Sequence, residues 1–462
     1  MSKQISEQTV LFMSILKWVF LAVIIGIIVG TTTTIFLKFL EFSLSHTSKY
    51  WYLLILIPIA LFLNSLIKKY IFPEDDVETT NQVIDCIHNS KSISWKSAVK
   101  AFFLPIITLS GGGSAGKEAP CADVGAAAGS IFSKIFKLSK TDKQKLMICG
   151  VSSGFAAVFG TPIAGAIFGV EVLFIGGLLY EVLLPSLIAG LVAYQVAITF
   201  GITYFTHTLD IIPVFSNSFF VLIVAAGIFF GMISFITIEF FHLTKKLSLK
   251  IKLWDPLKAL IAGTIIIVLV LLFSDIYLGL GLNTIEGVVT GSQVVWYAFL
   301  IKLLFTSLTL NFGGSGGLVT PVLFIGATSG FLFANVLSLD TSTFAAIGLV
   351  AVLAGVANAP ISASILSIEL FGPTIAPYAA VACVISFLMT GHRSLFLSQV
   401  LSIRKSSLII VPTGKKISRT KTKFQSKNVG AIKYVINASE KKEELKKNYN
   451  KSLEKYKKDL TK

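Results

Sequence analysis

One glycine- and proline-rich motif occurs twice in this chain, with 201 residues between equivalent positions. The first copy, Gly112-Gly-Ser-Ala-Gly-Lys-Glu-Ala-Pro120, recurs as Gly313-Gly-Ser-Gly-Gly-Leu-Val-Thr-Pro321. A second pair of segments, 156–163 and 354–361, each ends in Pro-Ile, with a glutamate nine residues beyond the proline. A chain that carries such broken units twice is expected to consist of two structural repeats.

The composition places most of this chain in lipid. Of its 462 residues, 54% are hydrophobic and only 14% are charged, and the mean hydropathy is +0.80. Several long apolar runs contain internal Pro or Gly, which predicts broken or tilted helices rather than straight spans. The sequence therefore predicts an all-α membrane protein.

The basic residues are distributed unevenly and predict the topology. Segment 404–462 has 18 Lys and Arg against 5 Asp and Glu, whereas loop 204–216 has no Lys or Arg. The positive-inside rule puts the tail in the cytoplasm and the loop outside. We expect a multi-pass protein of the cell membrane, with both termini cytoplasmic. Its predicted parts are a cytoplasmic N-terminus (1–10), a first membrane repeat (11–203), an extracellular loop (204–216), a second membrane repeat (217–403) and a basic cytoplasmic tail (404–462).

The repeated motif has the chemistry of an anion site. A flexible glycine turn followed closely by proline is typical of a helix start, where proline loses no hydrogen bond. The free N–H groups of a helix start carry the positive end of the helix dipole. Two such starts meeting inside the bilayer would hold an anion weakly enough to release it. The motif residues expected to form the two helix starts are Gly112, Gly113, Ser114, Pro120, Gly313, Gly314, Ser315, Thr320 and Pro321.

Glu118 is the candidate gating and proton-carrying residue. It lies in the first helix start, and its equivalent in the second copy is Val319. A carboxylate in lipid is costly, and its simplest partners are the N–H groups that would otherwise hold an anion. Protonation would neutralise this tethered competitor and link anion passage to pH. The alternative is a structural carboxylate that pairs with Lys117 or caps its own helix.

These motifs resemble those of a known family. Gly116-Lys-Glu-Ala-Pro120 is similar to the Gly-Lys/Arg-Glu-Gly-Pro signature of the CLC chloride channel and antiporter family, and Gly317-Leu-Val-Thr-Pro321 is similar to its Gly-x-Phe-x-Pro signature. The resemblance implies an inverted-repeat bundle of about eighteen broken and tilted helices. It also implies a homodimer with one pore per subunit, passage of chloride or another small anion, and exchange with protons in some members. Glu118 falls on the family's gating glutamate.

Carried over residue by residue, the resemblance implies a set of anion-binding positions. Backbone N–H groups of Gly116, Lys117, Gly317, Leu318 and Val319 would bind the anion. Thr79 would take the place of a family serine, although the family's Gly-Ser-Gly-Ile-Pro signature is absent here. Phe396 falls where the family has a tyrosine, so its ring could line the pore without donating a hydrogen bond.

The expected proton path differs from that of the family's antiporters. Val172 stands where their inner, proton-transferring glutamate would be, directly after Glu171. Channels of the family also have valine there, and the family's fluoride-transporting branch lacks that glutamate but still couples to protons. The segments Val-Thr-Pro321 and Gly391–Ser394 resemble that branch, whereas Leu318 and Phe396 depart from it. We therefore expect a chloride channel or exchanger, with a fluoride/proton antiporter as the alternative. Glu171 and Glu369 are expected to anchor helices by accepting backbone N–H bonds.

Two hypotheses from other classes have less support. A cation-coupled solute symporter also fits broken-helix repeats, but glycine-rich helix starts favour an anion. A serine hydrolase would need a histidine base beside Ser114, whereas the repeat of this serine as Ser315 points to a role in loop geometry. The histidines and cysteines form no ligand-spaced cluster. We expect no enzyme, no cofactor, no metal and no nucleic-acid partner.

Overall fold

The computed structural model describes residues 2–47, 54–72, 79–209, 217–420 and 422–424. Within these residues the regular structure consists of α-helices with very little sheet, which confirms the predicted all-α fold. The α-helices of the first half are α1 (Ser2–Thr47), α2 (Leu56–Tyr70), α3 (Thr79–His88), α4 (Trp95–Ser110), α5 (Glu118–Ile135), α6 (Lys140–Phe159), α7 (Pro162–Glu171) and α8 (Tyr180–Thr199). Those of the second half are α9 (Asn217–Lys250), α10 (Asp255–Leu272), α11 (Leu282–Val289), α12 (Ala298–Asn311), α13 (Val319–Val336), α14 (Thr341–Ala357), α15 (Pro360–Phe371) and α16 (Ala376–Met389).

The remaining elements are short. The 3₁₀ turns are η2 (Asp275–Tyr277), η3 (Pro373–Ile375) and η4 (Ile417–Arg419). The strands are β1 (Phe174–Ile175), β2 (Val400–Leu401), β3 (Ile409–Ile410), β4 (Lys415–Lys416) and β5 (Lys423–Phe424). In one small sheet β2 lies between β1, which is parallel to it, and β4, which is antiparallel; β3 pairs with β5. These pairings tie the chain after α16 to the end of α7.

The helices that carry the duplicated motifs begin at equivalent residues in the two halves. α5 and α13 start at Glu118 and Val319 and contain 18 residues each. α7 and α15 both start with proline, two residues after a position that ends the preceding helix: Gly160 and Asn358 adopt left-handed backbone conformations, with φ of 72° and 57°. The duplicated motifs therefore act as paired helix starts and stops.

Glycines let neighbouring helices approach closely at the same place in each half. A Cβ atom at Gly125 in α5 would collide with the carbonyl oxygen of Gly150 in α6. In the second half, a Cβ at Gly326 in α13 would lie 2.5 Å from the carbonyl oxygen of Gly348 in α14. Small residues at such crossings allow backbone-to-backbone packing in lipid, where association depends on van der Waals contact.

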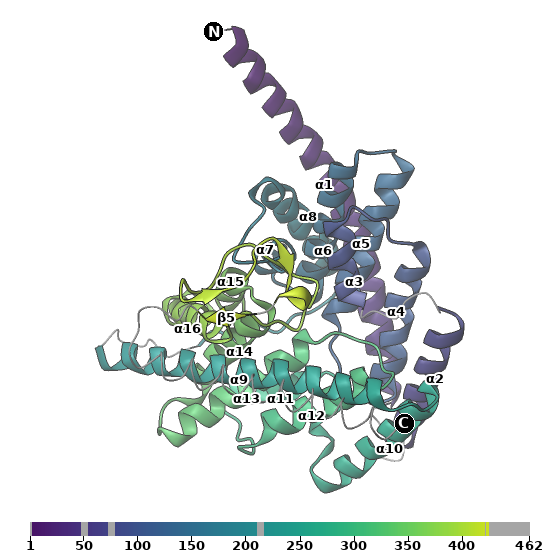
Figure 1. Cartoon of the computed structure of the whole chain (residues 1–462), viewed down its shortest axis with the longest axis vertical. Helices are drawn as coiled ribbons and strands as arrows, with labels where there is room; N and C mark the ends of the chain where they lie inside the picture. Colours follow the sequence, from purple (N-terminus) through teal and green to yellow (C-terminus); the bar gives the residue numbers. More distant parts are fainter. Residues whose placement is uncertain (1, 48–53, 73–78, 210–216, 421, 425–462) are drawn as a thin grey trace, which may run out of the picture.

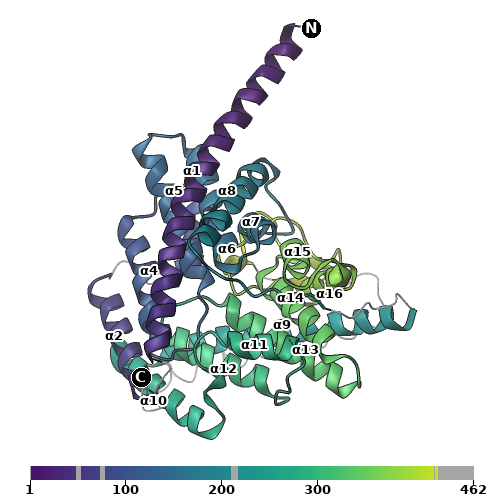
Figure 2. The same ribbon diagram turned by 180° about the vertical axis from the view of Figure 1, so that it is seen from behind.

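The chain is an integral membrane protein with several apolar helices. Five helices of the described residues are long and apolar enough to cross a bilayer, and they differ in how deeply they are embedded in the protein. In the most apolar part of α1 only 28% of residues are buried, whereas 78% are buried in α13. α1 runs along the foreground of Figure 2 and α9 crosses the foreground of Figure 1, so the two long helices lie on opposite faces. The helix that follows the second copy of the motif, α13, is thus much more deeply buried in the protein than α1.

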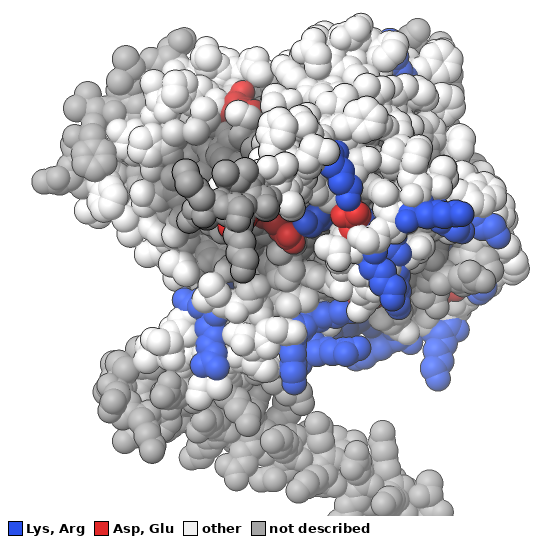
Figure 3. All heavy atoms as spheres, turned by 90° about the horizontal axis from the view of Figure 1, so that it is seen from above, with Lys and Arg blue, Asp and Glu red and all other residues white. Residues whose placement is uncertain are grey.

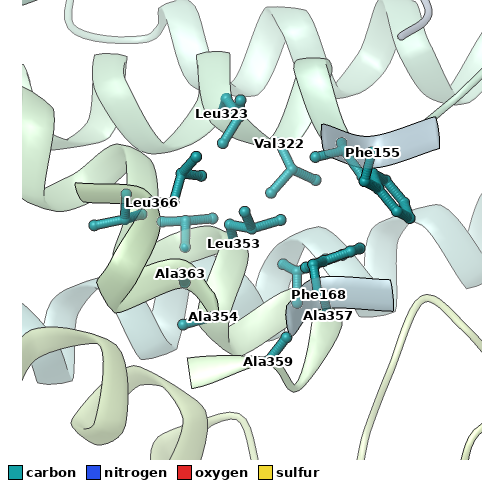
Figure 4. Close-up of a cluster of buried hydrophobic side chains, with 14 of the residues drawn as sticks. Phe155, Phe168, Val322, Leu323, Leu353, Ala354, Ala357, Ala359, Ala363 and Leu366 are labelled. Carbon is teal, nitrogen blue, oxygen red and sulfur yellow. The ribbon is translucent and has the colours of Figure 1, made fainter. Parts of the chain in front are cut away.

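The core joins the two halves. Side chains from α6 and α7 meet side chains from α13, α14 and α15 in one apolar cluster (Figure 4). Phe155 and Phe168 of the first half are in edge contact, with ring centroids 4.5 Å apart, and they lie beside Val322 of the second half. Since neither half buries these surfaces alone, the halves are expected to fold as one unit.

The described residues contain sixteen α-helices, in agreement with the bundle of broken and tilted helices that the resemblance implied, and the last of them, α16, ends at Met389. After Gly391 (φ 66°) the chain forms turns and the short strands β2 to β5 instead of a helix. The polar and β-branched residues from 398 to 410 offer no continuous apolar face for a spanning helix. Loop residues 210–216 and tail residues 425–462 lie outside the described part of the chain.

Candidate anion site

The two glycine loops bring the starts of α5 and α13 together inside the protein. The backbone N–H of Gly116 donates to the carbonyl of Gly317, and the N–H of Gly317 donates to the carbonyl of Gly116, both at 2.7 Å. This reciprocal pair forms an isolated antiparallel bridge. Gly116 and Gly317 are themselves equivalent in the two repeats, so the bridge lies where the repeats face each other. The helix starts are thus held side by side.

Each loop is held by a threonine of the opposite half. The N–H of Ser114 donates to the Thr309 hydroxyl in α12 (3.1 Å), and the N–H of Ser315 donates to the Thr108 hydroxyl in α4 (2.9 Å). Thr108 and Thr309 are separated by the same 201 residues as the motif itself. The two serines therefore have matching structural roles, as the repeat predicted.

The hydroxyl groups of these serines also have structural partners. The Ser114 hydroxyl lies 3.0 Å from the Thr306 hydroxyl, and the Ser315 hydroxyl donates to the side-chain oxygen of Asn64 at 3.1 Å. A nucleophilic serine needs a base that takes its proton, and a threonine hydroxyl cannot act as one. The contacts fit a role in loop geometry.

Glu118 is buried between the two helix starts, with 1% of its surface exposed. Its carboxylate accepts the backbone N–H of Thr320 at 3.2 Å and the Thr320 hydroxyl in a second, very short contact. Thr320 belongs to the first turn of α13, so the glutamate of one repeat occupies the helix start of the other. Sequence reasoning listed Thr320 only as a motif residue and missed this pairing.

The mutual bonding of Gly116 and Gly317 narrows the set of possible anion-binding groups. Both N–H groups were predicted to bind the anion, but each already donates to a carbonyl. The N–H groups that follow them, of Lys117, Glu118, Leu318 and Val319, belong to helix starts, where the first donors have no acceptor within their own helix. The anion-binding hypothesis therefore shifts by one residue in each loop.

A small cavity of about 60 Å³ lies beneath the second glycine loop. Phe396, which is 5% exposed, is one of the residues that line it, and its role as a pore residue stays a prediction. Thr79 begins α3, but its side chain lies outside the described residues; the neighbouring Thr80 and Asn81 line the cavity. We call this space the tail-side cavity, and its lining residues are Lys68, Thr80, Asn81, Lys100, Ala119, Phe241, Leu310, Gly314, Ser315, Gly316, Leu318 and Phe396.

A larger cavity of about 740 Å³ opens at the other end of α2. It is lined by Leu54 and Ile57, whereas Lys68 near the opposite end of α2 lines the tail-side cavity. Its other walls are the end of α4 with Gly111 and Gly112, and the segment 275–284. We call it the loop-side cavity. The two cavities approach the glycine loops from opposite directions.

Val172, which stands where the proton-transferring glutamate of the family's antiporters would be, is buried and contacts the chain after α16. Val172 is 3% exposed, and its carbonyl accepts the side-chain amide of Gln399 at 2.7 Å. Gln399 also donates to the Ala357 carbonyl at 2.8 Å, and its own oxygen accepts the Ser394 hydroxyl. The chain after α16 therefore packs against Val172.

Glu171 and Glu369 confirm the prediction that they anchor helices. Glu171 accepts the N–H groups of Ile361 and Ser362 at 3.0 and 2.8 Å, at the start of α15. Glu369 accepts those of Ile163 and Ala164 at 3.0 and 2.8 Å, at the start of α7. Each glutamate caps the helix start of the opposite repeat, where a negative charge interacts favourably with the helix dipole.

The sequence analysis did not predict that two lysines are buried. Lys100 in α4 and Lys302 in α12 are 2% and 0% exposed. Each lies within an apolar run, and that position was the signal that could have revealed them. Lys302 falls one residue after the position equivalent to Lys100.

Comparison with known proteins agrees with the geometry. The family model described as voltage gated chloride channel matches residues 59–391. A chloride/fluoride channel protein of Pseudomonas syringae pv. tomato is 34% identical over 402 residues, covering 85% of this chain and 88% of the relative. The voltage-gated ClC-type chloride channel ClcB of Shigella flexneri is 24% identical over 337 residues, covering 70% of this chain and 80% of the relative.

Solved structures show the same fold. A CLC-type fluoride/proton antiporter superposes with a TM-score of 0.78 at 24% identity, covering 84% of this chain and 98% of that one. A slow cyanobacterial Cl⁻/H⁺ antiporter superposes with a TM-score of 0.72 at 19% identity, covering 81% and 94%. With the paired helix starts, the family model and the relatives in agreement, this chain belongs to the CLC family of voltage-gated chloride channels.

Proposed function

We propose that this protein passes small inorganic anions, chloride first, through the region where α5 and α13 begin, and that Glu118 gates the passage. One observation carries the proposal: the Glu118 carboxylate is bonded to the N–H and hydroxyl of Thr320 at the opposite helix start. Groups that hold a carboxylate can also hold a free anion of the same charge. The Glu118 carboxylate then competes with the transported anion for the hydrogen-bond donors of Thr320.

The gate works by exchange at Thr320. While the Glu118 carboxylate is ionised it occupies both Thr320 donors. A proton removes its charge and weakens these bonds, because an ionised acceptor binds donors about twice as strongly as a neutral one. The side chain can then leave, and an anion takes its place beside the N–H groups of Leu318 and Val319. Anion passage is therefore expected to rise as pH falls.

The charge distribution supports an orientation in the membrane. Lys and Arg side chains gather in a band in Figure 3, while a broad area of the same face is almost free of charge. Lys134 in the last turn of α5, Lys137 in the turn that follows and Lys140 at the start of α6 are all exposed. We propose that this basic side and both termini face the cytoplasm, that the protein lies in the cell membrane, and that it works as a homodimer.

Fluoride is the second candidate for the transported ion. The Thr320 hydroxyl gives the site an O–H donor in addition to N–H donors, and small, hard anions accept such bonds most strongly. The relative in Pseudomonas syringae is named a chloride/fluoride channel protein. Leu318 and Phe396 remain departures from the pattern expected of the fluoride branch.

Flux measurements on reconstituted protein test the proposal. Chloride and fluoride efflux from liposomes is measured over a range of pH for the wild type, Glu118→Ala and Glu118→Gln. Both variants are expected to pass anions at a rate that no longer depends on pH. Glu181→Gln, which changes an exposed carboxylate paired with Lys145, is the matched control and should keep the wild-type profile. An unchanged pH profile in Glu118→Ala would refute the gate, and wild-type liposomes that pass neither ion would refute the function.

A reversal-potential measurement under a proton gradient then separates conduction from exchange. A reversal potential that follows the anion gradient alone indicates a channel. A reversal potential that shifts when the proton gradient changes indicates that anion transport is coupled to proton transport.

A further inference from the structure

Asn64 is a buried side chain of α2 that bonds to both halves of the protein. It is 0% exposed, and its amide nitrogen donates to the carbonyl of Leu104 at 2.7 Å and to the Thr108 hydroxyl, both in α4. Its amide oxygen accepts the hydroxyl of Ser315, in the second glycine loop, at 3.1 Å. An amide oxygen can only accept, so the hydrogen of the Ser315 hydroxyl points toward α2.

Thr108 fixes the orientation of this amide. The Thr108 hydroxyl donates its one hydrogen to the carbonyl of Leu104 at 3.1 Å and accepts the N–H of Ser315 at 2.9 Å. The part of the Asn64 amide that contacts this hydroxyl must therefore be a donor, which turns the amide oxygen to Ser315. The hydrogen of the Ser315 hydroxyl is thus held by Asn64.

This bond lies at the wall of the tail-side cavity. Ser315 is half-buried and lines the cavity, which at about 60 Å³ has room for water molecules or a small anion. Its equivalent in the first glycine loop, Ser114, is 0% exposed, lines neither the tail-side nor the loop-side cavity and bonds to Thr306 instead. Of the two repeated serines, Asn64 therefore bonds to the one that lines a cavity.

We propose that Asn64 is a specificity-determining residue, which keeps the Ser315 hydroxyl from donating to anions in the tail-side cavity. This inference rests on the proposed function and adds the residue that sets how firmly the transported ion is held beside the second glycine loop. While its hydrogen is turned to Asn64, the Ser315 oxygen can offer the cavity only lone pairs, which repel an anion.

The chemistry of the two candidate anions gives this bond a direction. An additional O–H donor would hold fluoride more tightly than chloride, since the smaller ion accepts such bonds more strongly. Tighter binding would also slow the release of the ion from the cavity. By withholding this donor, Asn64 favours fast passage and weak discrimination between the two anions.

Replacing Asn64 by leucine tests this role. Asn64→Leu nearly keeps the size of the side chain and frees the Ser315 hydroxyl, while the Leu104 carbonyl and the Thr108 hydroxyl keep their bonds to other partners. Isothermal titration calorimetry measures the binding of sodium fluoride and sodium chloride to the purified protein at one pH, and liposome efflux measures transport. The fluoride dissociation constant is expected to fall about tenfold, which corresponds to one hydrogen bond to a charged group, and the chloride constant by a smaller factor. The maximal rate of fluoride efflux should fall as well.

Two further variants separate the freed hydroxyl from a change in packing. Asn64→Leu combined with Ser315→Ala should return both dissociation constants to the wild-type values. Thr306→Val is the matched control, because it frees the hydroxyl of Ser114 in the same way. Since Ser114 lines neither cavity, anion binding in Thr306→Val should not change.

Ser315→Ala alone keeps the test open if Asn64→Leu does not fold. The hydroxyl donates to no anion in the wild type, so its loss should change the fluoride dissociation constant by less than about twofold. A tenfold weakening in this variant, an unchanged fluoride constant in Asn64→Leu, or a gain that persists in the double variant would each overturn the inference. Wild-type liposomes that pass neither ion would instead refute the proposed function, so the two failures are distinguishable.

Discussion

The two glycine loops share a backbone but differ in one side chain. Each loop ends in a helix start, each serine N–H is held by a threonine of the other half, and the two loops bond to each other through Gly116 and Gly317. The first loop then places Glu118 where the second has Val319, and Glu118 reaches across to Thr320. Ala119 is the equivalent of Thr320 and has no hydroxyl. The loop backbones are thus alike in the two repeats, whereas the Glu118–Thr320 pair, which is the gate in the proposed function, has no counterpart in the other direction.

The largest expected effect comes from breaking the shared framework. Gly125→Leu would force a side chain into the backbone of Gly150, which cannot move without separating α5 from α6. Overpacking at such a crossing is expected to cost more than about 3 kcal/mol and to leave no folded protein after detergent extraction. Gly326→Leu should have the same effect in the second half. Size-exclusion chromatography measures the amount of folded protein. The control is Gly287→Ala, because the nearest atom to the new Cβ belongs to the flexible Ser292 side chain. A folded Gly125→Leu would mean that the crossing is looser than described.

Moving the carboxylate from one loop to the other tests the asymmetry. Glu118→Val should abolish pH dependence, and adding Val319→Glu should restore it, because the new carboxylate reaches the Ala119 N–H. Because Ala119 has no hydroxyl, the ionised carboxylate is held by one hydrogen bond fewer than in the wild type. Inhibition of anion flux at high pH is therefore expected to be about tenfold weaker, which corresponds to the free energy of one hydrogen bond to a charged group. Adding Ala119→Thr should strengthen it again. Liposome efflux across pH measures each step; no pH dependence in the double variant would show that the loops are not interchangeable.

Removing the hydroxyl alone gives a smaller effect. Thr320→Val keeps the backbone N–H but loses the bond that favours the ionised carboxylate. Opening should then need less acid, so the midpoint of the flux–pH curve is expected to move to higher pH by about one unit. Thr320→Ser keeps the hydroxyl and should behave like the wild type. A midpoint that stays in place in Thr320→Val would indicate that the N–H alone holds the gate.

The smallest effect should come from the helix anchors, which are alike in the two halves. Glu171→Gln and Glu369→Gln each weaken a pair of backbone bonds and the favourable contact with a helix start. Each change is expected to lower stability by about 1–2 kcal/mol, somewhat more for Glu171, which is the more buried of the two. Thermal unfolding followed by circular dichroism measures both, with Glu181→Gln as the control. If the losses of stability in the two variants differ by more than about 1 kcal/mol, the two anchors are not equivalent.

The sequence predicted the features that depend on local pattern. The helix starts at Glu118 and Val319, the two repeats and the anchoring role of Glu171 and Glu369 follow from glycine, proline and glutamate at fixed spacings. The Glu118–Thr320 contact could not be predicted, because it joins residues 202 positions apart and depends on how the loops pair. The burial of Lys100 and Lys302 was missed, since a lysine within an apolar run can also extend its ammonium group to the surface.

The bridge between Gly116 and Gly317 limits how this protein can move. Many transporters with inverted repeats expose their substrate alternately by rocking one repeat against the other. Here two backbone hydrogen bonds join the repeats between the starts of α5 and α13, and both would have to break before the repeats could separate at this point. Rotation about the bonds of a single glutamate side chain needs no such rupture. Opening is thus expected to need movement of the Glu118 side chain alone, while the backbone of the two repeats stays almost rigid. A movement of this size favours rapid opening.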